Sequence, residues 1–318
     1  MIERKFHEEV PFTKVRLHSS EKISPWGFIF EEFKNSLTDE DIRYYPNRSN
    51  VYSKLQNFYG YDSLIMGFGS DRCIKYFFEL HQKTTNIITT DPCFPMYPVY
   101  GDIFNMNITK VPYNGTKFPI QDILKSYNED SVFVFSNPSS PIGDLISRED
   151  IITILEHGIP TLIDEAYIEF SNGASCIDLL DEYDNLYITR TFSKALGSAG
   201  IRFGVMLSQK QNLDLVFQYR DMYENSGLSL KWVDTLLKHT SKINEYIQSV
   251  KDTRSLLISF LKNKNIEFVP SESNWIHIKG NFDIPSELEI RDNCTIPGLG
   301  DGWIRLCVAE DMKYYNWL

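Results

Sequence analysis

The stretch "NLYITRTFSKALGSAGIRFGVML", residues 185–207, places a lone lysine between two short apolar runs. The runs Asn185–Arg190 and Phe203–Leu207 predict two β-strands. The loop between them consists mainly of small and hydroxyl residues, and it carries Lys194 and Arg202 without any acidic residue. We therefore expect the partners of these two cations to come from other parts of the chain.

The sequence before this stretch alternates short apolar runs with helical periods. Strands are predicted at 63–69, 86–90, 107–113, 131–136 and 160–167. Helices are predicted at 52–60, 71–82, 95–104, 120–127 and 147–158, the last with a serine N-cap and a glycine stop. This alternation predicts an α/β domain with a mostly parallel sheet flanked by helices.

The pattern changes after Ser208. A long helical region over 211–265 is followed by predicted strands at 266–270, 274–280 and 303–309. This predicts a smaller α+β domain that the first ~30 residues join. We expect an N-terminal arm at 1–30, a large domain at 31–210 and a small C-terminal domain at 211–318.

The composition of the chain limits the kinds of molecule that it is expected to bind. The chain has 318 residues and a net charge of −11, which argues against nucleic acid or an anionic membrane as a partner. No apolar run approaches the ~18 residues of a membrane span, and the charged N-terminus predicts no signal peptide. Five scattered cysteines predict reduced thiols in a cytoplasmic protein, and the six histidines have no metal-binding spacing.

Polar residues follow several predicted strands, and ligands of open α/β sheets bind outside these carboxyl ends. Gly69, Ser70 and Asp71 open a predicted helix, which suits an anion site, although such a turn also serves as a plain helix cap. Asp164 ends an apolar strand, where a carboxylate is costly unless it meets a positive group. Lysine, aspartate, a phosphate cup and an aromatic residue together indicate a pyridoxal phosphate site.

The sequence resembles the fold-type I pyridoxal-phosphate enzymes, and most closely the histidinol-phosphate aminotransferases. "DEAYIEF" followed by "TRTFSKALGSAGIRFG" is specific to that group. "RYYPN", "GFGSD", "DPCFPMYPVY", "SNPSSPIG" and "GWIRLCVA" occur in the order of the family, so the resemblance runs from about Tyr44 to Ala309. It implies a seven-stranded large-domain sheet and a homodimer, whereas the small domain of this chain is expected to be shorter than that of the family.

The resemblance also implies roles for the cofactor-site residues. Lys194 would form a Schiff base with pyridoxal phosphate and move the substrate's proton. Asp164 would pair with the ring nitrogen, and Tyr167 would bond the ring's 3-oxygen. Phe94 would stack on the ring, and Tyr45 would reach the phosphate of the neighbouring subunit. The residues implied for the cofactor's own phosphate are Gly69, Ser70, Asp71, Thr191, Ser193 and Arg202.

Arg305 is implied as the ligand of the substrate α-carboxylate, and Arg291 as a ligand of a substrate phosphate. The chain departs from the family at Ser140, where an asparagine normally contacts the 3-oxygen, and in the N-terminal segment, which keeps only Glu21 as a substrate-binding candidate. Phe94 replaces the usual tyrosine. Each of these roles has a purely structural alternative, because aromatic residues also fill cores and arginines also form salt bridges.

The resemblance implies an aminotransferase that moves an amino group between a donor such as glutamate and a keto or aldehyde acceptor, possibly phosphorylated. The alternatives are a decarboxylase of an amino acid phosphate, similar to threonine-phosphate decarboxylase, and a non-catalytic relative. The intact Lys194, Asp164 and Arg202 argue against the last. Sequence does not separate the first two, which differ in the Cα bond that is broken.

Overall fold

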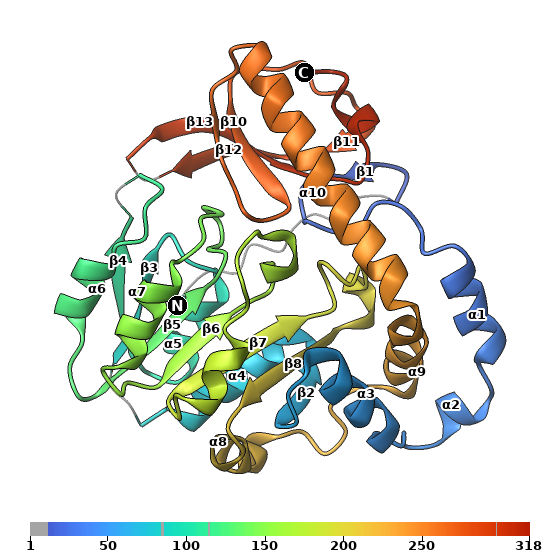
Figure 1. Cartoon of the computed structure of the whole chain (residues 1–318), viewed down its shortest axis with the longest axis vertical. Coiled ribbons are helices and arrows are strands. Elements are labelled where there is room, and N and C mark those ends of the chain that lie inside the picture. Colours follow the sequence, from blue (N-terminus) through green and yellow to red (C-terminus); the bar gives the residue numbers. More distant parts are fainter. Residues whose placement is uncertain (1–11, 84–85, 114, 297) are drawn as a thin grey trace.

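The computed structural model describes residues 12–83, 86–113, 115–296 and 298–318. Its larger part surrounds a seven-stranded sheet in the order β2-β8-β7-β6-β5-β3-β4 (Figure 1). The strands are β2 (Leu64–Phe68), β3 (Asn86–Asp91), β4 (Asn107–Pro112), β5 (Ser131–Ser136), β6 (Thr161–Asp164), β7 (Leu186–Thr191) and β8 (Phe203–Ser208). The predicted α/β class is confirmed.

Strand β8 is the exception to the parallel arrangement, because it runs antiparallel to both β2 and β7. The other neighbouring pairs are parallel. Parallel strands need a long crossover, usually a helix, whereas the connection from β7 to β8 is a short loop with one 3₁₀ turn. This loop carries Lys194, and it turns back along the carboxyl end of β7.

The sheet is buried on both faces, and its side chains divide between two cores. On β5, Val132 and Val134 belong to one core, while Phe133 and Phe135 belong to the other. This is the two-residue alternation of an extended strand. The first core packs on α4 (Gly69–Leu80), α5 (Met96–Ile103) and α8 (Lys210–Val216); the second packs on α3 (Ser49–Tyr59), α6 (Ile120–Ser126), α7 (Arg148–Leu155) and α9 (Gly227–Leu236).

The predicted helices of the large domain are confirmed, whereas the long helical region predicted after Ser208 is divided into several helices. Helix α7 has the predicted N-cap, since the Ser147 side chain accepts a hydrogen bond from the Asp150 amide. The region at 211–265 is not continuous: α8, α9 and α10 (Thr240–Asn263) are separated by short turns and by an irregular segment around residues 220–226. Helix periodicity shows which residues face a core, but not where the chain turns between two helices.

The smaller lobe is an antiparallel sheet in the order β12-β13-β10-β9, with α10 on one face. Its strands are β9 (Phe268–Val269), β10 (Trp275–Lys279), β12 (Arg291–Ile296) and β13 (Gly300–Cys307). The sequence did not predict β12. In the described residues, a loop without a helix links β10 to β11 (Leu288–Glu289), in keeping with the expected shortened domain.

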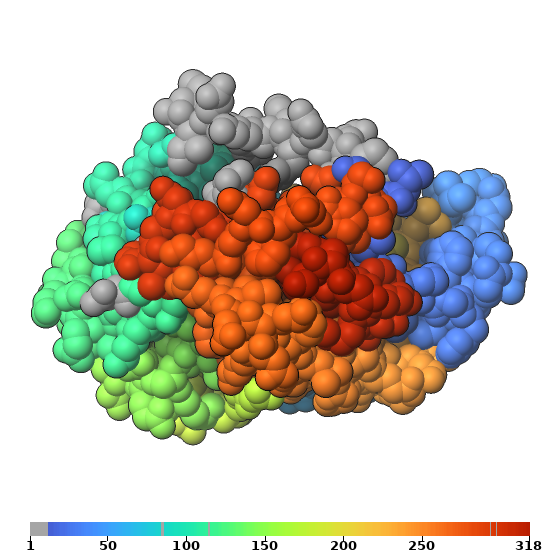
Figure 2. Space-filling view, turned by 90° about the horizontal axis from the view of Figure 1, so that it is seen from above, coloured from blue at the N-terminus to red at the C-terminus, as the bar shows by residue number. Residues whose placement is uncertain are grey.

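The N-terminal segment lies against this smaller lobe. Strand β1 (Val15–Arg16) pairs in parallel with β11, and α1 (Phe28–Ser36) and α2 (Glu40–Arg43) follow it. Seen from above, the C-terminal residues form one continuous mass beside the N-terminal helices (Figure 2). Residues 1–11 of the expected arm lie outside the described residues. Among those described, no helix is both long and apolar enough to cross a membrane.

Candidate active site

Asp164 is the last residue of β6 and lies beside Thr189 of β7 in the parallel register. The Thr189 hydroxyl donates to Asp164 Oδ1 at 2.8 Å. Burial raises the pKa of Asp164 to about 7, although the hydrogen bond from Thr189 lowers it. The nearby negative charge of Asp71 raises the pKa further. No ion pair to Asp164 exists in the described part of the chain. The site thus holds a buried carboxylate that lacks a positive partner.

Lys194 lies in the loop between β7 and β8, with the buried side chains of Phe192, Ala195 and Leu196 fixing the loop around it. Its Nζ donates to the Ser19 carbonyl oxygen at 2.7 Å. The same atom lies 5.5 Å from the ring centroid of Tyr167, which is half-buried just after β6. The predicted lysine, aspartate and tyrosine are therefore brought to one end of the sheet.

The first turn of α4 and the Arg202 loop form a cup for an anion. Arg202 Nη1 lies 3.4 Å from Ser193 Oγ, and Nη2 lies 3.5 Å from Asp71 Oδ2. The Gly69 backbone has a φ of +76°, and a Cβ there would come within 2.6 Å of Arg202 Nη2. Free amide groups at a helix start attract anions, and the guanidinium adds a full charge.

The remaining members of the predicted phosphate set lie around this cup. Ser70 is in the first turn of α4, and Thr191 ends β7, where its Oγ1 accepts a hydrogen bond from the Ser193 amide at 3.1 Å. The first turn packs tightly on β8, because a Cβ on Gly204 would lie only 2.3 Å from the Ser70 nitrogen. The cup therefore depends on close contact between α4 and β8.

Phe94 and Ser140 lie in two further loops at the carboxyl edge of the sheet. Phe94 precedes α5 and packs edge-on against Tyr97, with ring centroids 5.6 Å apart. The Ser140 amide donates to Ser136 Oγ at 2.8 Å, which fixes the turn where the family has its asparagine. Sequence analysis missed Tyr97, which is buried and whose pKa is raised well above 10, first by burial and then by the Asp164 charge.

The smaller lobe contributes a row of three basic residues across its sheet. Arg305 of β13 lies opposite His277 of β10 and opposite Arg291 of β12. Arg305 is buried, donates to the His18 carbonyl oxygen at 3.0 Å and lies over the Trp275 ring. His277 was not predicted, although its alternation with Trp275 in "NWIHIKG" places both on this face.

Trp275 connects this row to the lysine end of the site. Its ring packs edge-on against Tyr167 at 4.6 Å, and its Nε1 donates to the Pro141 carbonyl oxygen.

Burial lowers the pKa of His277 to about 3, helped by Arg305 and Arg291, so this histidine is neutral near pH 7. Burial, followed by the Arg305 charge, also lowers the pKa of Arg291. An anion entering this row would relieve the repulsion between the arginines.

Two predicted residues lie apart from this convergence. Glu21 forms an ion pair with Arg16 at 3.0 Å, so its carboxylate already has a partner in the N-terminal segment. Tyr45 is 78% exposed and stacks on Tyr223, with ring centroids 4.1 Å apart. It also lines a surface cavity of about 590 Å³ between α2, α3 and α9. Within a single chain, neither side chain contacts Lys194 among the described interactions.

The arrangement fits an elongated ligand with a phosphate at one end and a protonated ring nitrogen at the other. The cup would suit the phosphate, and the unpaired Asp164 would suit the protonated nitrogen. Lys194 lies at the same end of the sheet. The described residues contain no group of three or more metal-ligating side chains.

Comparisons with known proteins agree with this geometry. A family model described as aminotransferase class I and II matches residues 29–314. The histidinol-phosphate aminotransferase of Thermococcus gammatolerans is 29% identical over 279 residues, which cover 84% of this chain and 79% of that protein.

Two solved structures share the fold. Histidinol-phosphate aminotransferase from Sinorhizobium meliloti, in complex with pyridoxal-5'-phosphate, has a TM-score of 0.81 at 18% identity and covers 95% of this chain and 88% of that one. L-threonine-O-3-phosphate decarboxylase from Porphyromonas gingivalis has a TM-score of 0.78 at 17% identity and covers 92% and 94%.

Proposed function

The chain belongs to the class I and II aminotransferases and is a pyridoxal-phosphate-dependent aminotransferase, and we propose that Lys194, Asp164 and Tyr167 form its reaction centre. When bound, pyridoxal phosphate supplies an aldehyde and an electron-withdrawing ring that stabilises negative charge at the substrate Cα. Lys194 would hold the cofactor covalently through Nζ and, once released, would move a proton at Cα. Tyr167 would donate its hydroxyl proton to the ring oxygen.

The single observation that carries this proposal is the buried Asp164 without a cation. Its raised pKa reports that the ionised carboxylate is unstable in its present surroundings. A protonated ring nitrogen would restore the ionised form by direct pairing, and Asp164 would keep that nitrogen protonated. Phe94 would cover one face of the ring and exclude water. Ser140 would approach the ring oxygen more weakly than an asparagine, because its side chain is shorter.

The substrates that fit best are L-glutamate as the donor and a phosphorylated keto or aldehyde compound as the acceptor. Arg305 offers a planar fork that suits the α-carboxylate. Arg291, in the same row, offers a second contact for a side-chain carboxylate or a phosphate. The curated relatives carry the name of an enzyme for a phosphorylated substrate, which supports this choice.

The quaternary state that fits best is a homodimer with shared active sites. We place this homodimer in the cytoplasm as part of the proposal. Tyr45 is exposed beside other exposed apolar side chains, including Ile42, Tyr44 and Met222. A second copy of the chain would cover this surface, and Tyr45 would then reach the phosphate of the partner.

The test uses the Lys194→Ala variant. We expect it to fold and to bind pyridoxal phosphate through the cup, but to lose any borohydride-reducible link, which mass spectrometry of the reduced protein detects. Lys251→Ala is the matched control, because Lys251 also donates to a backbone carbonyl, that of Ser171. A reducible link that survives in Lys194→Ala would contradict the assignment.

The same preparation distinguishes the reaction class. Wild-type enzyme given L-glutamate alone should release 2-oxoglutarate in an amount equal to the number of sites. Carbon dioxide released from an amino acid phosphate, with no 2-oxoglutarate from glutamate, would contradict the proposed substrates.

A further inference from the structure

Asn225 lies outside the predicted site, yet its side chain contacts the backbone of the phosphate cup. It is buried just before α9, and its Nδ2 donates to the Gly67 carbonyl oxygen at 3.1 Å and to the Arg202 carbonyl oxygen at 3.4 Å. Gly67 lies on β2 and Arg202 immediately precedes β8. One carboxamide therefore joins these two neighbouring strands next to the start of α4.

The Arg202 backbone needs such support. Its φ of +53° lies in the left-handed region, which is uncommon and strained for a side chain of this size. The Arg202 carbonyl also accepts a hydrogen bond from the Gly69 amide at 2.9 Å, so it ties the arginine to the first residue of α4. A rotation of this peptide would turn the guanidinium away from the cup and release Gly69.

The segment that presents Asn225 is itself fixed. The neighbouring Glu224 carboxylate is fully buried and accepts hydrogen bonds from Arg48 at 2.6 Å, Arg220 at 2.8 Å and Tyr52 at 3.0 Å. Breaking one partner of such a buried group is costly, so the segment has little freedom. The Asn225 amide consequently approaches the two carbonyls from a rigid base.

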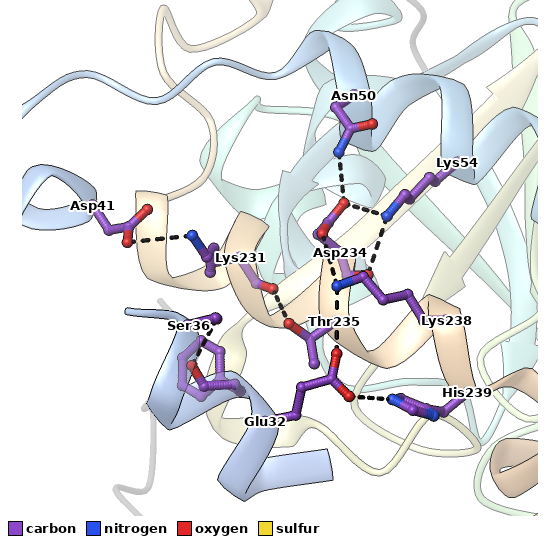
Figure 3. Close-up of polar contacts among 11 residues, drawn as sticks. Glu32, Ser36, Asp41, Asn50, Lys54, Lys231, Asp234, Thr235, Lys238 and His239 are labelled. Atoms are coloured by element: carbon purple, nitrogen blue, oxygen red, sulfur yellow. Dashed lines mark hydrogen bonds and ion pairs between the residues drawn. The ribbon is translucent and has the colours of Figure 1, made fainter. Parts of the chain in front are cut away.

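Helix α9 continues this support on both of its sides. Towards the cup, Ser229 Oγ donates to the Ile201 carbonyl oxygen at 2.9 Å. On the opposite side, Asp234 receives hydrogen bonds from Asn50 and Lys54 of α3, and Lys231 pairs with Asp41 (Figure 3). Residue 201 is thus held by a helix that α2 and α3 anchor, and residue 202 is held by the segment that leads into this helix.

We infer that Asn225 is a positioning residue for the cofactor phosphate, acting through the backbone of Arg202. The inference rests on the proposed role of Arg202 in binding that phosphate. Both hydrogen-bond partners of Asn225 Nδ2 are carbonyl oxygens, so only a side chain that donates hydrogen bonds can serve here. Asn225 would not touch the phosphate. It would set the direction of the guanidinium and of the first α4 amide.

The experiment compares two ligands on the apoenzyme, pyridoxal phosphate and pyridoxal, which differ only in the phosphate. Asn225→Ala should weaken pyridoxal phosphate binding by roughly ten- to a hundredfold and change pyridoxal binding little, because the loss is confined to the phosphate end. Asn225→Leu is similar in size and shape but cannot donate, and it should show the same selective loss without a large cavity. Dissociation constants come from the absorption change on titration.

Asn185→Ala is the matched control. Asn185 is also buried, and its Nδ2 also donates to two backbone carbonyls, those of Leu155 and Ile159, but at the opposite end of the sheet. It should lower the melting temperature without changing the ratio of the two affinities. A selective loss of pyridoxal phosphate affinity in this control would overturn the inference, as would equal weakening of both ligands in the Asn225 variants.

Arg202→Ala separates this inference from the proposed function. It should lower the preference for pyridoxal phosphate, and adding Asn225→Ala should then cause no further loss. An unchanged preference in Arg202→Ala would show that the proposed phosphate cup is wrong. If Arg202→Ala removes the preference while both Asn225 variants keep it, the cup stands and the positioning role is overturned.

Discussion

Asp164 shows at the residue scale how burial determines what a side chain requires. A carboxylate placed beside Asp71 and Glu165 without a cation holds its proton up to a pH of about 7. In the unfolded chain the same group loses its proton near pH 4. Between these two values the folded apoenzyme binds a proton that the unfolded chain has released, so its stability falls as the pH rises through this window.

The Asp164→Asn variant of the apoenzyme should lack this pH dependence. At pH 5 its free energy of unfolding should exceed that of the wild type by only about 1–2 kcal/mol, because the Asp164 proton is already released in the unfolded wild type at that pH. At pH 8 the variant should be the more stable of the two, by at most on the order of 4 kcal/mol. Denaturant titrations at several pH values measure this difference. A constant difference between pH 5 and pH 8 would contradict the buried, unpaired state of Asp164.

Arg305 leads to a prediction about substrate affinity. Arg305→Ala should raise the KM for L-glutamate, because the lost charge-assisted contacts are worth about 2–4 kcal/mol. Steady-state kinetics with varied glutamate measures the change. Arg254→Ala provides the control, since Arg254 is equally buried in the same lobe but donates to the Ser273 carbonyl oxygen. It should reduce stability and leave this KM unchanged; a similar rise in both variants would point to a general loss of structure.

At the scale of elements, sequence patterns predicted each strand of the large sheet, because buried strands are short apolar runs bounded by turn residues. They did not predict β12, whose residues Arg291–Ile296 are mostly polar. They also did not reveal the turns that divide 211–265. Strand direction at β8 depends on the length of its connection, which an alternating pattern does not express.

In the candidate site, too, some residues could be predicted from the sequence and others could not. Lys194, Asp164 and Arg202 lie in recognisable motifs, so their convergence could be predicted from the resemblance. Tyr97 and Asn225 could not, because a tyrosine in a helix or an asparagine before one is common in any sequence. Their importance arises from packing between distant elements, which only the folded backbone defines.

The contact of α4 with β8 gives a prediction at this scale. Gly204→Ala would place a Cβ 2.3 Å from the Ser70 nitrogen, so the first turn of α4 must move away from β8. We expect a loss of about 1–3 kcal/mol in stability and weaker pyridoxal phosphate binding. Gly200→Ala is the control, because nothing lies within 4 Å of its Cβ position. Denaturant titration and cofactor titration test both variants, and unchanged cofactor affinity in Gly204→Ala would contradict the tight contact.

At the scale of the whole molecule, the expected dimer can be tested by complementation. Lys194→Ala and Tyr45→Ala should each be impaired. After equal amounts are mixed and subunits exchange at random, about half of the dimers are mixed, and each mixed dimer has one site with both residues. Roughly a quarter of all sites should then be intact. Activity of the mixture measures this, and light scattering confirms the dimer. If exchange is demonstrated, Tyr45→Ala is inactive alone and no activity returns, the site is not shared.

The pairing of β1 with β11 has a consequence for the order in which the protein is made. Val15 emerges from the ribosome long before its partner Leu288, and at roughly 5–20 residues per second the wait is on the order of tens of seconds. Throughout this interval the large sheet is available to fold, since all of its strands precede residue 209. The His18 carbonyl can reach Arg305 only after the strands of the smaller lobe have also been synthesised. The larger part, in which we propose the cofactor site, can therefore fold before the smaller lobe, in which we propose the substrate contacts.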